Sequence, residues 1–216
     1  DGIENLDNVA METARKKWNS IAKPLHSLGK LEEHIIRIAG ITGNAEVELK
    51  NRALIAMCAD NGVVEEGVTQ TGQEVTAIVA ENFLKYDTSV GVMCKQNHAE
   101  IFPVDMGMVT DTKVRTDHKI AYGTQNMTKG PAMTREQAVK GLEAGIDMVR
   151  ELNDKGYRIL ATGEMGIGNT TTSSAVASVL LKQPVEEMTG RGAGLTSEGL
   201  VRKINAIKKA ITLNKP

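Results

Sequence analysis

The chain has 216 residues and a formal net charge of -1, with 26 Lys and Arg against 27 Asp and Glu. This length suits one substantial core, and the balanced charge lacks the basic excess that indicates nucleic-acid binding. No apolar stretch reaches the length of a membrane span, and the polar start DGIENLDN lacks a signal-peptide core. We therefore expect a cytoplasmic protein with a small-molecule ligand, and neither a membrane nor a nucleic-acid partner.

Helical and strand patterns alternate along the chain, which is typical of an α/β fold with a parallel sheet. A capping box, Thr134 with Gln137, marks the start of the longest helix. The predicted elements are helices over 6–21 and 30–38, a strand over 52–59, helices over 74–85 and 90–95, a strand over 99–104, a helix over 134–155, a strand over 158–162, and helices over 171–181 and 198–213. They predict a Rossmann-like parallel sheet flanked by helices, with ligands at the carboxyl ends of the strands.

The cysteines and histidines do not form a metal-binding pattern. Cys58 and Cys94 both lie in apolar runs without C-x-x-C spacing, which favours buried, reduced thiols. The four histidines are scattered. We expect no metal and no cofactor.

The most informative segment is RILATGEMGIGNTTTSS at 158–174, where an apolar run ends at three glycines and a block of hydroxyl residues. Gly163, Gly166 and Gly168 permit positive φ angles and a close approach of ligand to backbone. Asn169, Thr170 and Thr171 could cap the next helix and present polar groups to an anion, so we expect the amides of residues 166–171 to bind one phosphate. The alternative is a tight strand-to-helix turn capped by threonines.

Two known nucleotide motifs fit this segment incompletely. Asn169 stands where the P-loop pattern requires lysine, which argues against a nucleoside triphosphate. Thr171 stands where the dinucleotide fingerprint requires its third glycine. What remains is a helix N-terminus suited to a single phosphate or carboxylate.

Three acidic residues fall at predicted strand ends. Asp60 precedes Asn61-Gly62 and Asp105 precedes Met106-Gly107, so each is either a ligand contact or a turn former. Glu164 lies between glycines, and since glutamate is a poor turn residue we expect it to face the ligand.

A second glycine-rich stretch, TGRGAG at 189–194, precedes the last predicted helix. Arg191 within it could serve a phosphate. Lys203 follows on the helix, where on its own it would be taken for a solvated lysine, as would Lys208 and Lys209.

Five blocks together carry a family resemblance. They are KPLHSLGKLE at 23–32, CADNGVVEEGVTQTGQEVT at 58–76, GTQNMTKGPAMT at 123–134, GEMGIGNTTTSSA at 163–175 and GRGAGL at 190–195. In this order and spacing the chain resembles nicotinate-nucleotide:dimethylbenzimidazole phosphoribosyltransferase over nearly its whole length. The resemblance implies transfer of the 5-phosphoribosyl group from nicotinate mononucleotide to a lower-ligand base such as 5,6-dimethylbenzimidazole, giving α-ribazole 5'-phosphate in cobalamin nucleotide-loop assembly.

The resemblance also implies an organisation and a site. It assigns residues 1–50 to the N-terminal part of a smaller helical domain and 51–216 to a parallel α/β nucleotide-binding domain, in a homodimer. Gln73 and its neighbours are expected at the aromatic-base pocket. At the phosphoribosyl end the expected residues are Glu164, Gly166, Gly168, Asn169, Thr170 and Lys203.

The chemistry implied by the resemblance agrees with the motifs. A mononucleotide carries one phosphate, which suits an anion site without the P-loop lysine. The pyridinium leaving group is already cationic, so its departure needs no general acid. An α product from a β donor requires an odd number of displacements, most simply one in-line attack by the base nitrogen, with a carboxylate to remove the azole proton.

One departure concerns the general base. The family is longer at the carboxyl end, and its catalytic glutamate is expected beyond Pro216, so we expect residues 1–216 alone to bind the donor without turnover, with Glu164 only in support. Thr196-Ser197 also replace two residues that are often acidic in the family. The alternatives are a non-catalytic nucleotide-binding module and a transferase that uses a purine or a phenolic acceptor.

Overall fold

The computed structural model describes residues 3–216, and its contacts divide the chain into two compact units, Asp1–Lys50 and Asn51–Pro216. The first unit pairs α1 (Asn8–Ser20) with α2 (Lys30–Thr42), and Ala14, Ile36 and Ala39 form its small core. Both predicted helices are confirmed. The second runs four residues further than predicted, and Gly43, with a φ of 65°, ends it.

A buried ion pair organises the segment between α1 and α2. Lys23 Nζ lies 2.7 Å from Glu32 Oε1, and that carboxylate also accepts a 3.2 Å hydrogen bond from the Leu28 amide. The hydrogen bond from Lys23 lowers the pKa of Glu32. The KPLHSLGKLE block therefore has a structural role within this unit.

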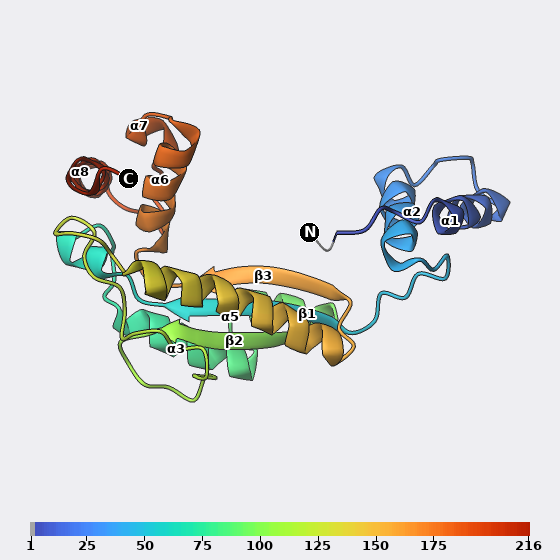
Figure 1. The fold of residues 1–216 in the computed structure, drawn as a ribbon, viewed down its shortest axis with the longest axis horizontal. Helices are drawn as coiled ribbons and strands as arrows, with labels where there is room; N and C mark the ends of the chain where they lie inside the picture. Colours follow the sequence, from blue (N-terminus) through green and yellow to red (C-terminus); the bar gives the residue numbers. More distant parts are fainter. Residues whose placement is uncertain (1–2) are drawn as a thin grey trace. The chain divides into compact units, whose positions relative to one another are not determined.

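The second unit contains a three-stranded parallel sheet in the order β2-β1-β3 (Figure 1). Its strands are β1 (Arg52–Ala59), β2 (Ala99–Gly107) and β3 (Ile159–Met165). The central strand aligns Cys58 with Asp105 on one side and Met57 with Glu164 on the other. The predicted parallel sheet is confirmed, and all three strands end at the same edge.

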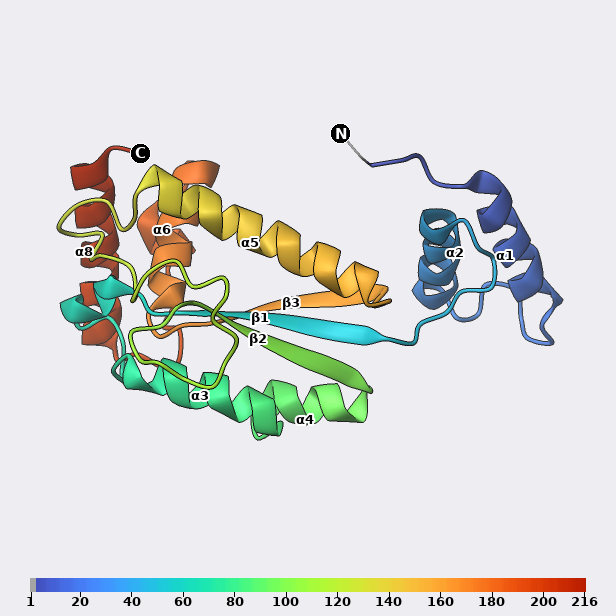
Figure 2. The same ribbon diagram turned by 60° about the horizontal axis from the view of Figure 1, so that its bottom comes forward.

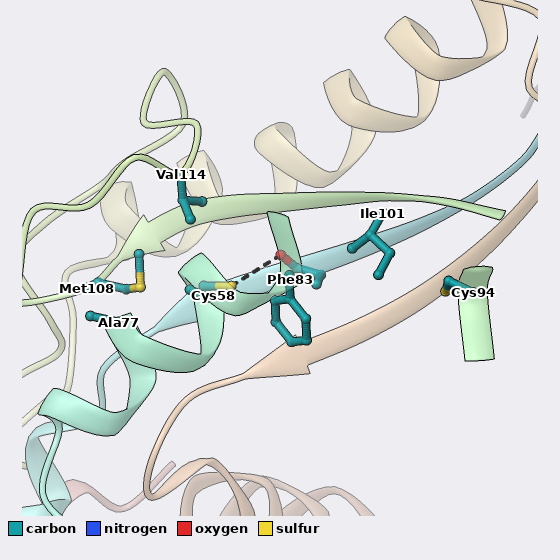
Figure 3. Close-up of a cluster of buried hydrophobic side chains, with 9 residues drawn as sticks. Cys58, Ala77, Phe83, Cys94, Ile101, Met108 and Val114 are labelled. Carbon is teal, nitrogen blue, oxygen red and sulfur yellow. Dashed lines mark hydrogen bonds between the residues drawn. The ribbon is translucent and has the colours of Figure 1, made fainter. Parts of the chain in front are cut away.

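Helices cover both faces of this sheet, as Figure 2 shows. One face packs against α3 (Glu74–Lys85) and α4 (Ser89–Gln96) through a cluster that includes Cys58 and Phe83 (Figure 3). The opposite face packs against α5 (Arg135–Asp154) through Met148 and Leu152. Burial raises the pKa of the Cys58 thiol to about 12, so this cysteine is a core residue, as predicted.

Three further helices lie beyond the carboxyl ends of the strands. They are α6 (Asn169–Leu181), α7 (Val185–Met188) and α8 (Ser197–Asn214). Ala175, Val185 and Ile207 form a second core with Val63 and Val68. Among residues 3–216, no helix is long and apolar enough to cross a membrane.

The structure differs from the sequence predictions mainly where tertiary contacts extend an element. β2 runs on to Gly107 because the Asp105 amide donates to the Arg115 carbonyl at 2.8 Å, and β3 runs on to Met165 because it stays paired with β1. Asp105 and Glu164 therefore lie inside strands. The 3₁₀ helix η1 (Gly62–Glu66) and the four-residue α7 are too short to show a periodicity. The capping box at Thr134 is confirmed.

Candidate functional site

The glycine turn between β3 and α6 approaches the end of β1 closely. A Cβ atom on Gly166 would lie 2.2 Å from the Ala59 carbonyl oxygen, so no other residue fits there without a backbone shift. Gly168 has a φ of 91° and is the N-cap of α6. Of the three glycines in this segment, only Gly168 has a positive φ angle. Gly163 is part of β3, and Gly166 is needed for the close approach to Ala59.

The start of α6 is not capped by a side chain. Asn169 is already the first helical residue, and neither it nor Thr170 or Thr171 caps the helix, so that expectation was wrong. Thr171 is fully buried on the packed face of α6, with Ser174 and Ser178, and does not reach the surface. We therefore remove Thr171 from the predicted ligand contacts.

The amides of this turn divide into engaged and free groups. Ile167 donates to Thr76 Oγ1 at 3.0 Å, Asn169 to the Gly166 carbonyl at 3.0 Å, and Thr171 to the Gly168 carbonyl at 2.9 Å. Within the described chain, the amides of Gly168 and Thr170 have no acceptor. A ligand at this helix start would meet those amides rather than the whole run that the sequence predicted.

Lys203 on α8 extends to the same place and is 1% exposed. Its Nζ donates to Thr170 Oγ1 at 2.7 Å and to the Gly190 carbonyl at 3.1 Å. No carboxylate of residues 3–216 pairs with it, and burial lowers its pKa. Its spacing with Ala206, Ile207 and Ala210 places it on the buried stripe of α8, a signal that could have distinguished it from a solvated lysine.

These groups surround a cavity of about 270 Å³. Its lining brings together six of the predicted residues: Gly166, Gly168, Asn169, Thr170, Arg191 and Lys203. Sequence reasoning missed one wall, formed by 68–71, where Gln70 hydrogen-bonds the Gly194 carbonyl. These residues lie within the 58–76 block that carries the resemblance, but none of them was predicted to contact a ligand.

Three other predicted residues are not in that lining. Gln73 is half-buried at the N-cap of α3 and donates from Nε2 to the Asn61 carbonyl at 3.2 Å. Glu164 is exposed on β3. Loss of water around its carboxyl raises the pKa of that group, and a hydrogen bond with Asn169 opposes the rise. Thr171 is buried, as described above.

Asp60 and Asp105 are fully buried and line neither this cavity nor the larger one described below. Asp60 Oδ2 accepts from the Val109 amide at 2.8 Å, and burial raises its pKa. Asp105 Oδ1 accepts from the Gly107 and Met108 amides at 2.9 and 2.7 Å, and Lys119 Nζ lies 3.1 Å from Oδ2. Asp105 therefore forms the turn after β2, whereas Asp60 ties the end of β1 to the loop that follows β2 and does not close the Asn61-Gly62 turn.

A larger, mostly apolar cavity of about 670 Å³ lies at the carboxyl ends of β1 and β2. Ala59, Gly107, Ile120 and Leu142 are among its lining residues, and Gln73 is not. Part of its wall comes from the 123–134 block that carries the resemblance, but the sequence did not place that block beside the strand ends, because the other lining residues come from β1, β2, the loop before that block, α5 and α6. In residues 3–216, no group of three or more potential metal ligands is present.

Comparison with known proteins shows which family this chain resembles. Residues 3–216 match the family described as Phosphoribosyltransferase. The chain is 50% identical, over 218 residues, to the nicotinate-nucleotide–dimethylbenzimidazole phosphoribosyltransferase of Ruminiclostridium cellulolyticum, and 50% identical over 217 residues to that of Clostridium acetobutylicum. Both alignments cover 100% of this chain and 62% of the relative.

A solved structure has the same fold. The crystal structure of CobT from Thermus thermophilus matches with a TM-score of 0.85 and 37% identity, over 94% of this chain and 62% of that one. The chain thus spans less than two thirds of the length of the relatives that it matches.

The structural assignment of Asp105 makes a testable prediction. Asp105→Ala leaves two buried amides without an acceptor and Lys119 with only the exposed carboxylate of Asp111, so we expect the free energy of unfolding to fall by about 3 kcal/mol in urea denaturation. Affinity for nicotinate mononucleotide, measured at a temperature where the variant is folded, should stay within about twofold. A large loss of affinity with little loss of stability would return Asp105 to the ligand site.

Proposed function

Because this chain belongs to the nicotinate-nucleotide–dimethylbenzimidazole phosphoribosyltransferase family, we propose that the protein transfers the phosphoribosyl group of nicotinate mononucleotide to a lower-ligand base such as 5,6-dimethylbenzimidazole. The products are nicotinate and α-ribazole 5'-phosphate. One observation carries the donor half of this proposal: Lys203 is a buried cation without an acidic partner among residues 3–216, and it lines the cavity at the glycine turn.

The donor phosphate fits the chemistry of this cavity. The free amides of Gly168 and Thr170 and the ammonium group of Lys203 are donors, and a phosphate supplies acceptors and the missing negative charge. Arg191 also lines the cavity, although its guanidinium already donates to the Leu195 carbonyl at 2.8 Å. A single phosphate is enough to satisfy this set.

The reaction breaks the bond from the anomeric carbon to the pyridinium nitrogen and forms a bond from that carbon to the base nitrogen. Nicotinate leaves with the electron pair of the broken bond and loses its positive charge. Attack from the opposite face inverts the β donor to an α product, and the azole proton passes to a base. Since Glu164 does not line the cavity and hydrogen-bonds Asn169, we assign it a supporting role and not that of the base.

The organisation proposed for the protein follows the resemblance. Residues 1–50 contribute to a small helical domain, 51–216 form the nucleotide-binding domain, and the working protein is a homodimer in the cytoplasm. Gln73 is assigned to the acceptor side. The α1–α2 pair and the parallel sheet are the parts of this organisation that the structure contains.

The reaction itself is the first prediction from this proposal. Protein from the complete reading frame should convert nicotinate mononucleotide and dimethylbenzimidazole to nicotinate and α-ribazole 5'-phosphate, detected by chromatography. Residues 1–216 alone should bind the donor without turnover, because no carboxylate of the described chain lines the cavity. Turnover by residues 1–216 would make Glu164 the leading candidate for the base, and absence of turnover in the complete protein with benzimidazole, purine and phenolic acceptors would refute the activity.

Lys203 provides a sharper test because its binding and folding effects should have opposite signs. The pKa of Lys203 is lowered in the folded state, so the unfolded state binds more protons and this residue opposes folding at neutral pH. Its unfavourable contribution should diminish as pH rises from the lowered pKa towards the ordinary value of about 10.4. In Lys203→Met we expect equal or higher stability, no such pH dependence, and a roughly thirtyfold weaker donor affinity, since a charged hydrogen bond contributes about 2 kcal/mol.

The matched control is Lys209→Met, which changes an exposed lysine on the same helix. It should alter neither donor affinity nor the pH dependence of stability. Calorimetric titration and thermal melts at several pH values measure both quantities. An unchanged dissociation constant in Lys203→Met would remove this lysine from the phosphate site.

Gly168 tests the turn. Its φ of 91° disfavours any side chain, and a Cβ atom would lie 3.0 Å from Val64 Cγ2 and 3.3 Å from Asn61 Cβ. We expect Gly168→Val to weaken nicotinate mononucleotide binding at least about tenfold, and Gly168→Ala to do so less strongly. Gly145→Ala, where nothing lies within 4 Å, is the control and should keep wild-type affinity. Unchanged affinity in a folded Gly168→Val protein would contradict the turn's assignment.

A further inference from the structure

Asn61 connects the end of β1 to the glycine turn, to α6 and to Gln73, and the proposed function gives it no role. It follows β1 as the N-cap of η1 and is 7% exposed. Its side chain reaches the glycine turn and the first turn of α6, and its backbone carbonyl reaches Gln73. Asn61 does not line the cavity that contains Lys203, so it can affect a bound ligand only through the residues that it contacts.

The side-chain amide fixes the peptide between Ile167 and Gly168. Asn61 Nδ2 donates to the Ile167 carbonyl at 3.2 Å, while the Ile167 amide is held by Thr76 Oγ1 at 3.0 Å. In a planar trans peptide the carbonyl and the following N–H point in opposite directions. Holding the Ile167 carbonyl towards Asn61 therefore directs the free Gly168 amide away from Asn61.

The other end of the same side chain fixes α6. Thr172 Oγ1 lies 3.2 Å from Asn61 Oδ1 and 2.9 Å from the Asn169 carbonyl oxygen, and its single proton is shared between these two acceptors. These partners favour one orientation of the amide, because the Ile167 carbonyl needs a donor and the Thr172 hydroxyl can donate to Oδ1. An aspartate of the same shape would place a carboxylate oxygen against the Ile167 carbonyl.

The backbone carbonyl of Asn61 contacts Gln73, the residue assigned to the acceptor side. This carbonyl accepts from Gln73 Nε2 at 3.2 Å and also from the Val64 amide at 3.1 Å. One buried residue is therefore bonded to the turn assigned to the donor and to the side chain assigned to the acceptor.

We propose that Asn61 is a positioning residue whose side chain sets the direction of the Gly168 amide and holds the first turn of α6, so that the donor phosphate meets a fixed set of donors. This inference rests on the proposed function. Because the side chain acts on ligand geometry, its loss should raise KM and the donor dissociation constant, whereas a purely structural loss would lower the active fraction and leave KM unchanged.

The test uses protein from the complete reading frame, with nicotinate mononucleotide and inorganic phosphate as probes. Asn61→Ala should raise the dissociation constants of both probes and the donor KM about tenfold, and Asn61→Asp should raise them further. Thr172→Val keeps Asn61 but removes one of its partners, and should give about a threefold rise even if the Asn61 variants do not fold.

The matched control is Asn126→Ala. Asn126 is 6% exposed and also bridges segments, through bonds to Glu66 Oε1 at 2.8 Å and from the Thr128 amide at 3.0 Å, but it does not touch the glycine turn or Gln73. The Asn126→Ala variant should be less stable than the wild type and keep its KM. If the folded Asn61 and Thr172 variants also keep the wild-type KM and affinity, the inference is wrong while the proposed function stands. If the wild type binds neither probe, the proposed function and this inference both fail.

Discussion

The close approach of the glycine turn to the end of β1 is the constraint on which the site depends. Gly166 passes so near the Ala59 carbonyl that a single methyl group would displace the backbone, and this proximity lets Asn61 reach both the turn and α6. The parallel pairing of β1 with β3 sets that distance. The sheet therefore fixes the separation between the glycine turn and Asn61 before any ligand is present.

Charge is distributed unevenly around the strand ends. The buried aspartates after β1 and within β2 accept hydrogen bonds from loop amides, and Lys119 lies beside Asp105, so both carboxylates stabilise the loop. Lys203 is the opposite case, a buried cation that only neutral oxygens of the described chain contact. This contrast explains why acids that looked equivalent in sequence differ in role, and why the cavity has a positive character that favours an anion.

Much of the fold could be predicted from the sequence, because β1 is a short apolar run, α3 follows a helical pattern, and both begin and end where the sequence predicted. Four of the six predicted residues in the cavity were predictable because glycines and polar residues are concentrated at one strand-to-helix turn, whereas Lys203 was expected there only from the family resemblance. The rest depended on long-range contacts. The burial of Asp105 depends on the loop that follows β2 folding back over it, and Thr171 faces inward with the packed face of α6. The contacts of the Asn61 side chain join segments more than a hundred residues apart.

The buried, unpaired Lys203 also links ligand supply to the lifetime of the protein. A ligand that binds only the native state stabilises it in proportion to the logarithm of its concentration above the dissociation constant. An anion over Lys203 would in addition remove the penalty of an uncompensated buried charge. In a cell, where proteases degrade the transiently unfolded fraction, the abundance of the protein would then rise with the level of any anion that binds there.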